Sequence, residues 1–180
     1  SLSCYLTNAK SKGASRILGI NPGASYGSAK RWYPEQFAKI AIELSDNFDI
    51  MIFGGAEELE FAKEIESHLT TNNISNYLNL AGKTSISELT NYISNLDIFI
   101  TGDSGPMHIA ASLDIPTIAL FGPTNPIETS QWKNPHSVII KKALKCQPCM
   151  KRKCPLKHHN CMKLIEAREV IDSISQVTQR

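Results

Sequence analysis

The sequence predicts a doubly wound α/β domain with a Rossmann-like parallel sheet. Short apolar runs alternate along the chain with segments whose apolar residues recur at helical spacing, a pattern typical of repeated β-α-β units. The runs are apolar at successive positions, as expected for strands that helices cover on both faces. Turns rich in small residues follow several runs, and in such sheets ligands bind beyond the carboxyl ends of the strands.

Six runs are predicted as strands, because each is short and apolar and most are followed by a turn signal. In chain order they are Arg16–Ile20, Asp49–Phe53, Tyr77–Leu80, Asp97–Thr101, Pro116–Phe121 and Val138–Ile140.

Five helices are predicted between and after these strands. Pro34 suits the first turn of a helix, where its missing N–H is not needed, and Ser85 suits an N-cap three residues ahead of Glu88. The predicted helices are Pro34–Leu44, Glu57–Leu69, Ile86–Ile93, Pro106–Leu113 and Glu166–Val177. Strands that alternate with helices in this way pair in parallel through right-handed crossovers.

Composition and charge exclude several classes of protein. The length of 180 residues suits one domain, and 42% hydrophobic with 20% charged residues excludes a disordered tail or a collagen-like repeat. The net charge of +2 is too small for a general nucleic-acid binder. No apolar run approaches the roughly 18 residues of a membrane span, and the start of the chain lacks the apolar centre of a signal peptide.

The first residues predict a domain boundary. The chain begins at Ser1, and residues 1–15 are polar and rich in Lys and Ser, so we expect this stretch to be a linker or tag remnant. The domain then occupies residues 16–180, and we expect the chain to be a fragment of a longer protein.

The turn after the first strand is the first candidate site. Residues 21–32 carry two glycines and several small residues, which let a backbone approach a ligand closely. Ser25 supplies a hydroxyl and Lys30 a mobile positive charge, a combination that suits a phosphate. A Walker A motif is absent. From spacing alone, a phosphate site and a flexible turn with a solvated lysine are equally favoured.

The turn after the fourth strand is the second candidate. Its sequence, G-D-S-G-P, leads from a strand into a helix, so the N–H groups of Ser104, Gly105 and Met107 would form an anion site. One alternative is a catalytic set of Asp103, Ser104 and His108, which the absence of a G-x-S-x-G elbow disfavours. Another is a plain N-cap, and capping is compatible with phosphate binding.

Two further strand ends carry ambiguous signals. Glu57 and Glu58 follow a glycine turn, where a carboxylate often holds ribose hydroxyls, although acidic residues in the first turn of a helix are also simply favourable. Thr84, in the G-K-T turn, is equally ambiguous. The chain contains no G-x-G-x-x-G fingerprint, which argues against an NAD-linked dehydrogenase.

A cluster of cysteines closes the sequence. Cys146, Cys149, Cys154 and Cys161 fall within 16 residues, and without a secretory signal such a cluster suggests structural zinc before disulfides. The spacing is tighter than in a usual zinc ribbon, and His158 and His159 add alternative ligands. Zinc, disulfides and reduced thiols therefore all stay open.

The same region concentrates positive charge. Residues 141–163 hold eight basic and no acidic residues, which leaves 11 basic against 17 acidic elsewhere, a net of −6. Such a segment is either a solvated loop or a contact for an anionic surface such as phosphorylated lipid head groups. The alternative function that follows is a zinc-stapled basic module that binds nucleic acid or an anionic membrane.

Taken together, the motifs resemble a known family. The residues that carry the resemblance are NPGASYGSAKRW at 21–32, FGGAEE at 53–58, AGKTSISELTNYISNLDIFITGDSGPMHIAASLDIPTIALFGPTNP at 81–126 and CQPCMKRKCPLKHHNCM at 146–162. They resemble the carboxy-terminal half of the bacterial lipopolysaccharide heptosyltransferases, glycosyltransferase family 9, from about Asn21 to Val170.

This resemblance implies a donor-binding domain. The family has the GT-B architecture of two Rossmann-like domains, of which the carboxy-terminal one holds ADP-L-glycero-D-manno-heptose. Ser25, Tyr26 and Lys30 match the diphosphate and sugar side, and Lys30 would stabilise the leaving ADP. Matching positions also place Glu58 at the ribose and Thr84 beside the adenine. The turn around diphosphate and heptose is matched by Asp103, Ser104 and Gly105, with His108 one helical turn further on.

The implied reaction is an inverting transfer of heptose to heptose or Kdo of the lipopolysaccharide core, with no cofactor required and no catalytic metal. In this family the general base and the lipid acceptor belong to the amino-terminal domain, which has no counterpart in residues 1–15. We therefore expect this chain to bind donor weakly and not to turn over alone. The resemblance also implies a cytoplasmic enzyme at the inner membrane of a Gram-negative bacterium, with peripheral membrane contact and no nucleic-acid partner.

Overall fold

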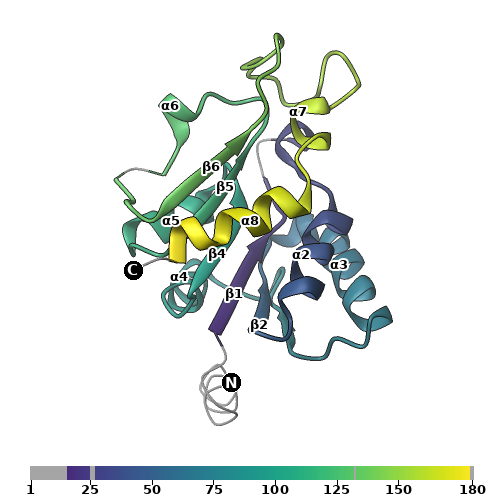
Figure 1. The fold of residues 1–180 in the computed structure, drawn as a ribbon, viewed down its shortest axis with the longest axis vertical. Helices are drawn as coiled ribbons and strands as arrows, with labels where there is room; N and C mark the ends of the chain where they lie inside the picture. Colours follow the sequence, from purple (N-terminus) through teal and green to yellow (C-terminus); the bar gives the residue numbers. More distant parts are fainter. Residues whose placement is uncertain (1–15, 25–26, 132, 179–180) are drawn as a thin grey trace.

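The computed structural model describes residues 16–24, 27–131 and 133–178, and its centre is one parallel sheet (Figure 1). Six strands pair in the order β3-β2-β1-β4-β5-β6, and every pairing is parallel. The strands are β1 (Arg16–Asn21), β2 (Phe48–Ile52), β3 (Tyr77–Asn79), β4 (Ile98–Gly102), β5 (Thr117–Phe121) and β6 (Ser137–Lys141). The predicted doubly wound parallel sheet is confirmed.

The five predicted helices are present within a few residues of their expected bounds. They are α2 (Pro34–Leu44), α3 (Leu59–Thr71), α4 (Ile86–Ile93), α5 (Gly105–Ser112) and α8 (Ala167–Thr178). The start of the helix predicted over Glu57–Leu69 is a separate short turn, η2 (Ala56–Glu58). Three further short turns of helix were not predicted, because three or four residues are too few to show a helical period. These are η1 (Ser28–Lys30), α6 (Pro126–Thr129) and α7 (Asn160–Lys163).

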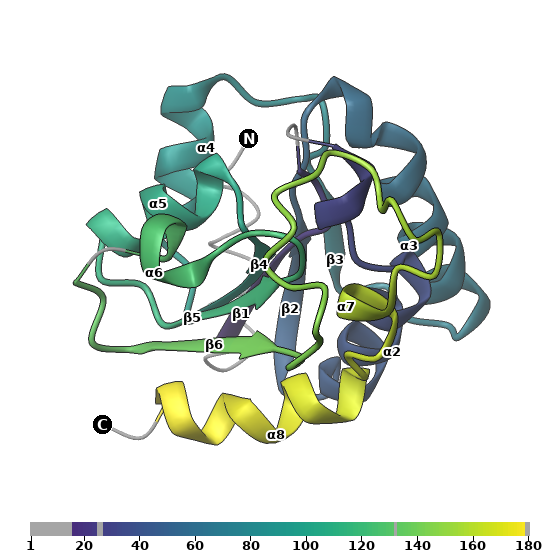
Figure 2. The same ribbon diagram turned by 90° about the horizontal axis from the view of Figure 1, so that it is seen from above.

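Helices cover both faces of the sheet, as Figure 2 shows. On one face, Leu18 and Ile20 of β1 pack in a cluster with residues of α2, α3 and α8. On the other face, Ile17 packs in a second cluster with residues of α4 and α5. Successive residues of β1 thus pack in opposite cores, which explains why residues 17–20 carry no polar side chain. No helix among the described residues is long and apolar enough to cross a membrane.

The predicted cap of α4 is present. Glu88 N–H donates to Ser85 Oγ at 3.3 Å, and Ser85 N–H donates to Glu88 Oε2 at 2.8 Å, so the two residues form a reciprocal capping box. The Ser85 hydroxyl also donates to Glu88 Oε2, at 2.7 Å, and the bonds that the Ser85 N–H and hydroxyl donate lower the pKa of the Glu88 carboxyl. The helix therefore begins at a defined residue, immediately after the turn that carries Thr84.

The strand order places one crevice at the carboxyl edge of the sheet. Strand β1 lies between β2 and β4. The strands that follow β1 are added on one side of it up to β3 and on the other side from β4 onward, so the strand order reverses at β1. Ligands bind at such a switch point. Asn21, at the end of β1, donates through Nδ2 to Thr101 Oγ1 at 3.1 Å and to Ser104 Oγ at 3.2 Å. The turns after β1 and β4 are therefore held together.

A substitution at Gly19 of β1 tests how closely the core between the sheet and helices α4 and α5 is packed. A Cβ there would lie 2.8 Å from the Phe99 ring and 3.1 Å from the Phe53 ring, and it would also overlap the Leu96 side chain. We expect Gly19→Val to lower the free energy of unfolding in urea by about 2 kcal/mol through overpacking. The control is Ile17→Val on the same face, with a loss of about 1 kcal/mol. A smaller loss for Gly19→Val than for this control would contradict the packing described.

Candidate functional site

A pocket of about 210 Å³ opens at the carboxyl edge of the sheet. The turns after β1, β2, β3 and β4 all contribute to its wall, and three of the residues expected from the sequence, Glu58, Thr84 and Ser104, line it. Ile86 and Leu89 add an apolar wall on α4, although Ile86 is 78% exposed. A site with polar groups on one side and an apolar wall on the other suits a small polar molecule with a flat ring.

The Glu58 carboxylate is buried and held in one orientation. Its Oε2 accepts the N–H of Gly55 at 2.8 Å, and Arg31 Nη2 lies 3.4 Å from its Oε1. Gly23 faces it so closely that a Cβ would lie 2.5 Å from Glu58 Cγ. A carboxylate fixed at the wall of a pocket is suited to accept hydrogen bonds from ligand hydroxyls.

A buried ion pair joins two more of the expected residues. Lys30 Nζ lies 2.6 Å from Asp103 Oδ2, and the two side chains are 11% and 6% exposed. The same oxygen accepts the hydroxyls of Thr124 at 2.7 Å and Thr129 at 3.1 Å. Charge-assisted hydrogen bonds of this kind hold both partners in place, so Lys30 stands at the switch point with a defined position.

The turn into α5 is open to a ligand. Ser104 is the N-cap of α5, and its Oγ lies 3.0 Å from Thr101 Oγ1. A Cβ added at Gly105 would meet nothing within 4 Å. Of the three N–H groups expected to bind an anion here, that of Met107 is instead bonded within the turn, to Ser104 O at 3.2 Å. The N–H groups of Ser104 and Gly105 are left as the expected donors, at a helix end that carries partial positive charge.

His108 lies apart from this arrangement. It is exposed on α5, whereas the hydroxyl of Ser104 is engaged by Thr101 and Asn21. The two therefore do not form the nucleophile and base of the catalytic alternative. Ser25 and Tyr26 lie outside the described residues.

Sequence reasoning missed several residues that the structure adds to the site. Thr124 belongs to the F-G-P-T turn after β5, a motif recognised only for its resemblance, and Thr129 lies on the unpredicted α6. Arg31 was quoted within its motif without a role, yet its guanidinium lies beside Glu58 and 5.4 Å from the centre of the Phe61 ring. Partners far apart in sequence leave no periodic signal, so only the fold reveals them.

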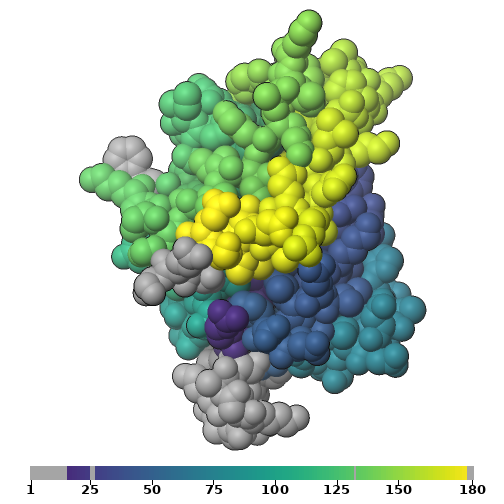
Figure 3. All heavy atoms as spheres, viewed as in Figure 1, coloured from purple at the N-terminus to yellow at the C-terminus, as the bar shows by residue number. Residues whose placement is uncertain are grey.

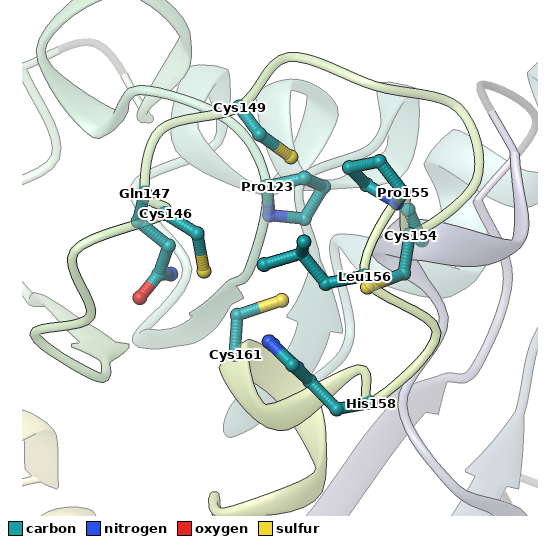
Figure 4. A pocket seen from close by; sticks show the side chains of 10 residues that line it. Pro123, Cys146, Gln147, Cys149, Cys154, Pro155, Leu156, His158 and Cys161 are labelled. Carbon is teal, nitrogen blue, oxygen red and sulfur yellow. The ribbon is translucent and has the colours of Figure 1, made fainter.

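The four clustered cysteines line a small cavity together with Pro123, Leu156 and His158 (Figure 4). All four are free thiols, and Cys161 is buried whereas the other three are partly exposed. Within the described part of the chain, no three His, Cys, Asp or Glu side chains are placed to hold a metal ion. The arrangement therefore gives the possible structural zinc no support, and no disulfide joins the four cysteines.

The basic segment 141–163 is packed onto the domain. Gln147 Nε2 donates to Gly122 O at 2.6 Å, and Met150 N–H donates to Pro123 O at 2.9 Å. A Cβ at Gly122 would lie 2.5 Å from Met162 Sδ. These contacts make the segment an integral part of the sheet's carboxyl edge, against the alternative of a separate zinc-stapled module.

Comparison with known proteins agrees with this site. A model of glycosyltransferase family 9 (heptosyltransferase) matches residues 3–160. Lipooligosaccharide heptosyltransferase 2 of Campylobacter jejuni is 46% identical over 168 residues, which are 93% of this chain and 53% of that protein.

Solved structures agree as well. The structure of E. coli ADP-heptose lps heptosyltransferase II matches with a TM-score of 0.78 at 27% identity, over 99% of this chain and 52% of that chain. The structure of E. coli heptosyltransferase WaaC with ADP matches with a TM-score of 0.70 at 21% identity, over 97% and 48%, which supports the fold alone. The chain thus spans about half the length of these relatives.

Cys161 provides a test of the cluster. Burial, and then the charges of Cys154, Cys149 and Cys146, raise the pKa of its thiol to about 11, so at pH 8 only about one molecule in a thousand carries the reactive thiolate there. We expect iodoacetamide to label Cys161 last among the four, as followed by peptide mass spectrometry. In urea all four should react alike, and labelling of Cys161 in the folded chain as fast as Cys149 would contradict the arrangement.

Proposed function

The chain belongs to glycosyltransferase family 9, and from this premise we propose that residues 16–180 form the donor-binding half of a GT-B heptosyltransferase of the lipopolysaccharide inner core. The donor is ADP-L-glycero-D-manno-heptose. The remainder of the enzyme supplies the acceptor domain, because the chain spans about half the length of its relatives. The relatives named heptosyltransferase 2 or II support addition of the second heptose.

One observation carries this proposal: the buried Lys30–Asp103 ion pair stands beside a carboxylate-walled pocket at the switch point of the sheet. A nucleoside diphosphate sugar needs a cation for the diphosphate and an acceptor for the ribose hydroxyls. Lys30 and Glu58 supply these two groups on neighbouring turns. The pocket between Glu58 and the apolar wall of α4 then takes the nucleoside.

The donor lies across the turns in a defined order. Glu58 accepts the ribose hydroxyls, and the adenine rests against Thr84 and the apolar wall. The diphosphate lies at the first turn of α5, at Ser104 and Gly105, within reach of Lys30. Asp103 orients Lys30 and faces the heptose, and Ser25 and Tyr26 complete the diphosphate and sugar side. His108 is exposed on α5, one helical turn beyond the diphosphate, and marks the edge of this region.

The chemistry is an inverting displacement at the anomeric carbon. An acceptor hydroxyl oxygen forms the new bond to that carbon while the bond to the diphosphate oxygen breaks, and ADP leaves with the electron pair. The general base on the acceptor side takes the hydroxyl proton. Lys30 and the N–H groups of the α5 turn stabilise the charge that develops on the leaving group, an electrostatic form of catalysis. The chain alone binds donor and does not turn over.

The acceptor places the enzyme at the cytoplasmic face of the inner membrane of a Gram-negative cell. The acceptor is a lipid-linked sugar, and the basic segment 141–163 is suited to anionic head groups. Contact with the membrane is peripheral, and nucleic acid is not a partner.

Lys30→Ala tests the phosphate site. Removing a buried cation from beside a diphosphate is expected to weaken ADP binding at least about tenfold, equivalent to about 1.4 kcal/mol, as measured by calorimetry on this chain. The control is Lys39→Ala, which removes an exposed lysine on α2. The proposal fails if the chain binds neither ADP nor ADP-heptose, or if both variants bind ADP like the parent.

Glu58→Ala tests the ribose site separately. The parent is expected to prefer ADP over 2′-deoxy-ADP, because a buried carboxylate acceptor discriminates in favour of the hydroxyl. The variant should bind both nucleotides with nearly equal, weaker affinity in an NMR titration. An undiminished preference for ADP in Glu58→Ala would assign ribose recognition to another residue.

A further inference from the structure

The basic segment 141–163, which contains the four clustered cysteines and is called the cysteine-rich segment below, contacts the turn that carries Lys30. Ala29, the residue before it, is 2% exposed. Its N–H donates to the carbonyl of Arg152 at 3.1 Å, and its carbonyl oxygen lies 2.9 Å from His159 Nε2. Both main-chain groups of one residue are thus bonded to a segment more than 120 positions away. In Figure 2 the chain before α7 runs beside the purple turn of η1.

The same contact explains the backbone at Gly27. Its φ of 153° is a value that favours glycine, and a Cβ there would collide with the main chain of Arg152. The backbone therefore approaches the segment closely at Gly27, just before η1, and at Ala29 within it.

The His159 ring is fixed by partners on both of its nitrogens. Nδ1 lies 3.0 Å from the hydroxyl of Tyr33, and Nε2 faces the Ala29 carbonyl. Because a carbonyl only accepts, Nε2 carries the proton, and Nδ1 accepts from the Tyr33 hydroxyl. Burial, and then the charges of Glu35, Cys161 and Cys154, raise the pKa of Tyr33, so the phenol keeps the proton it donates.

The η1 turn depends on such outside support. It is three residues long, and a single helical turn is not stable by itself, because few bonds offset the entropy of ordering it. The bond from Lys30 N–H to Gly27 O is 3.2 Å long. The neighbouring segment therefore fixes the position of the Lys30 main chain. The ion pair to Asp103 fixes the ammonium at the end of the Lys30 side chain.

We propose that His159 is a positioning residue for Lys30. Through its bond to the Ala29 carbonyl it holds η1 so that the Lys30 ammonium reaches both Asp103 and the donor diphosphate. Displacements of about 1 Å at such a group are enough to reduce activity strongly. The inference rests on the proposed function for the role of Lys30 in donor binding, whereas the grip on η1 stands on the contacts alone.

The experiment combines two measurements on the 180-residue chain. The first is amide hydrogen exchange of peptides covering residues 27–33, which needs no ligand. We expect His159→Ala to speed this exchange about tenfold, since one hydrogen bond that fixes the turn is lost. The control is His158→Ala, which changes the adjacent, exposed histidine whose Nδ1 accepts from Asn160 N–H and should leave the exchange unchanged. Thermal unfolding confirms that each variant is folded.

The second measurement is ADP affinity in a double-mutant cycle with Lys30→Ala. His159→Ala alone should weaken ADP binding about five- to tenfold, and it should have no further effect once Lys30 is alanine, because it acts through that residue. His159→Gln, whose amide can donate to the Ala29 carbonyl, should restore part of the affinity.

Two results would overturn the inference. One is unchanged exchange over residues 27–33 in His159→Ala, and the other is an equal loss of ADP affinity with and without Lys30. A parent chain that binds no ADP would instead refute the proposed function, and the exchange measurement would still decide whether His159 holds the turn.

Discussion

One carboxylate oxygen, Oδ2 of Asp103, joins the turns on which the candidate site is built. It accepts from Lys30 after β1, from Thr124 after β5 and from Thr129 on α6. A buried charge is costly unless it is paired and hydrogen-bonded, and removing one partner leaves the others uncompensated. The ammonium therefore stays with the carboxylate and the threonines stay around it, which brings three loops of a parallel sheet to one point.

The cysteine-rich segment also constrains Lys30, through the main chain of the residue before it. Asp103 fixes the tip of the Lys30 side chain, whereas Arg152 and His159 fix the main chain of the preceding residue. In Figure 3 the green to yellow-green atoms of segment 141–163 lie at the top of the molecule, the end toward which the strands run in Figure 1. Six of the seven lysines of segment 141–163 are exposed, and Lys142 pairs with Glu169. The backbone of the same segment contacts the turn that carries Lys30.

Predictions from the sequence were accurate where the signal is local. Strand β1 shows a short apolar run and helix α2 shows helical spacing, and the cap of α4 is encoded by Ser85 and Glu88 within four residues. Predictions were incomplete where the structure depends on contacts between distant residues. The role of Thr124, the orientation of Arg31 and the grip of His159 on Ala29 involve partners between 21 and 130 positions apart. The structural zinc is not supported for a related reason. The spacing of four cysteines along the chain does not determine the distances between their side chains in the fold.

By itself the sequence determined the elements, the parallel doubly wound sheet and the motifs that identify the family, because apolar pattern, turn residues and motif spacing are all written in neighbouring positions. Only the tertiary structure decided which of the candidate residues act together. It paired Lys30 with Asp103, buried Glu58 beside the pocket, left His108 exposed and turned the basic, cysteine-rich tail into a support for the first turn. The physical reason is that burial and hydrogen bonding are set by what lies nearby in space. The strand order places β1 beside β4, so the ends of these two strands meet at Asn21 and Thr101 although 80 positions separate these residues in the sequence.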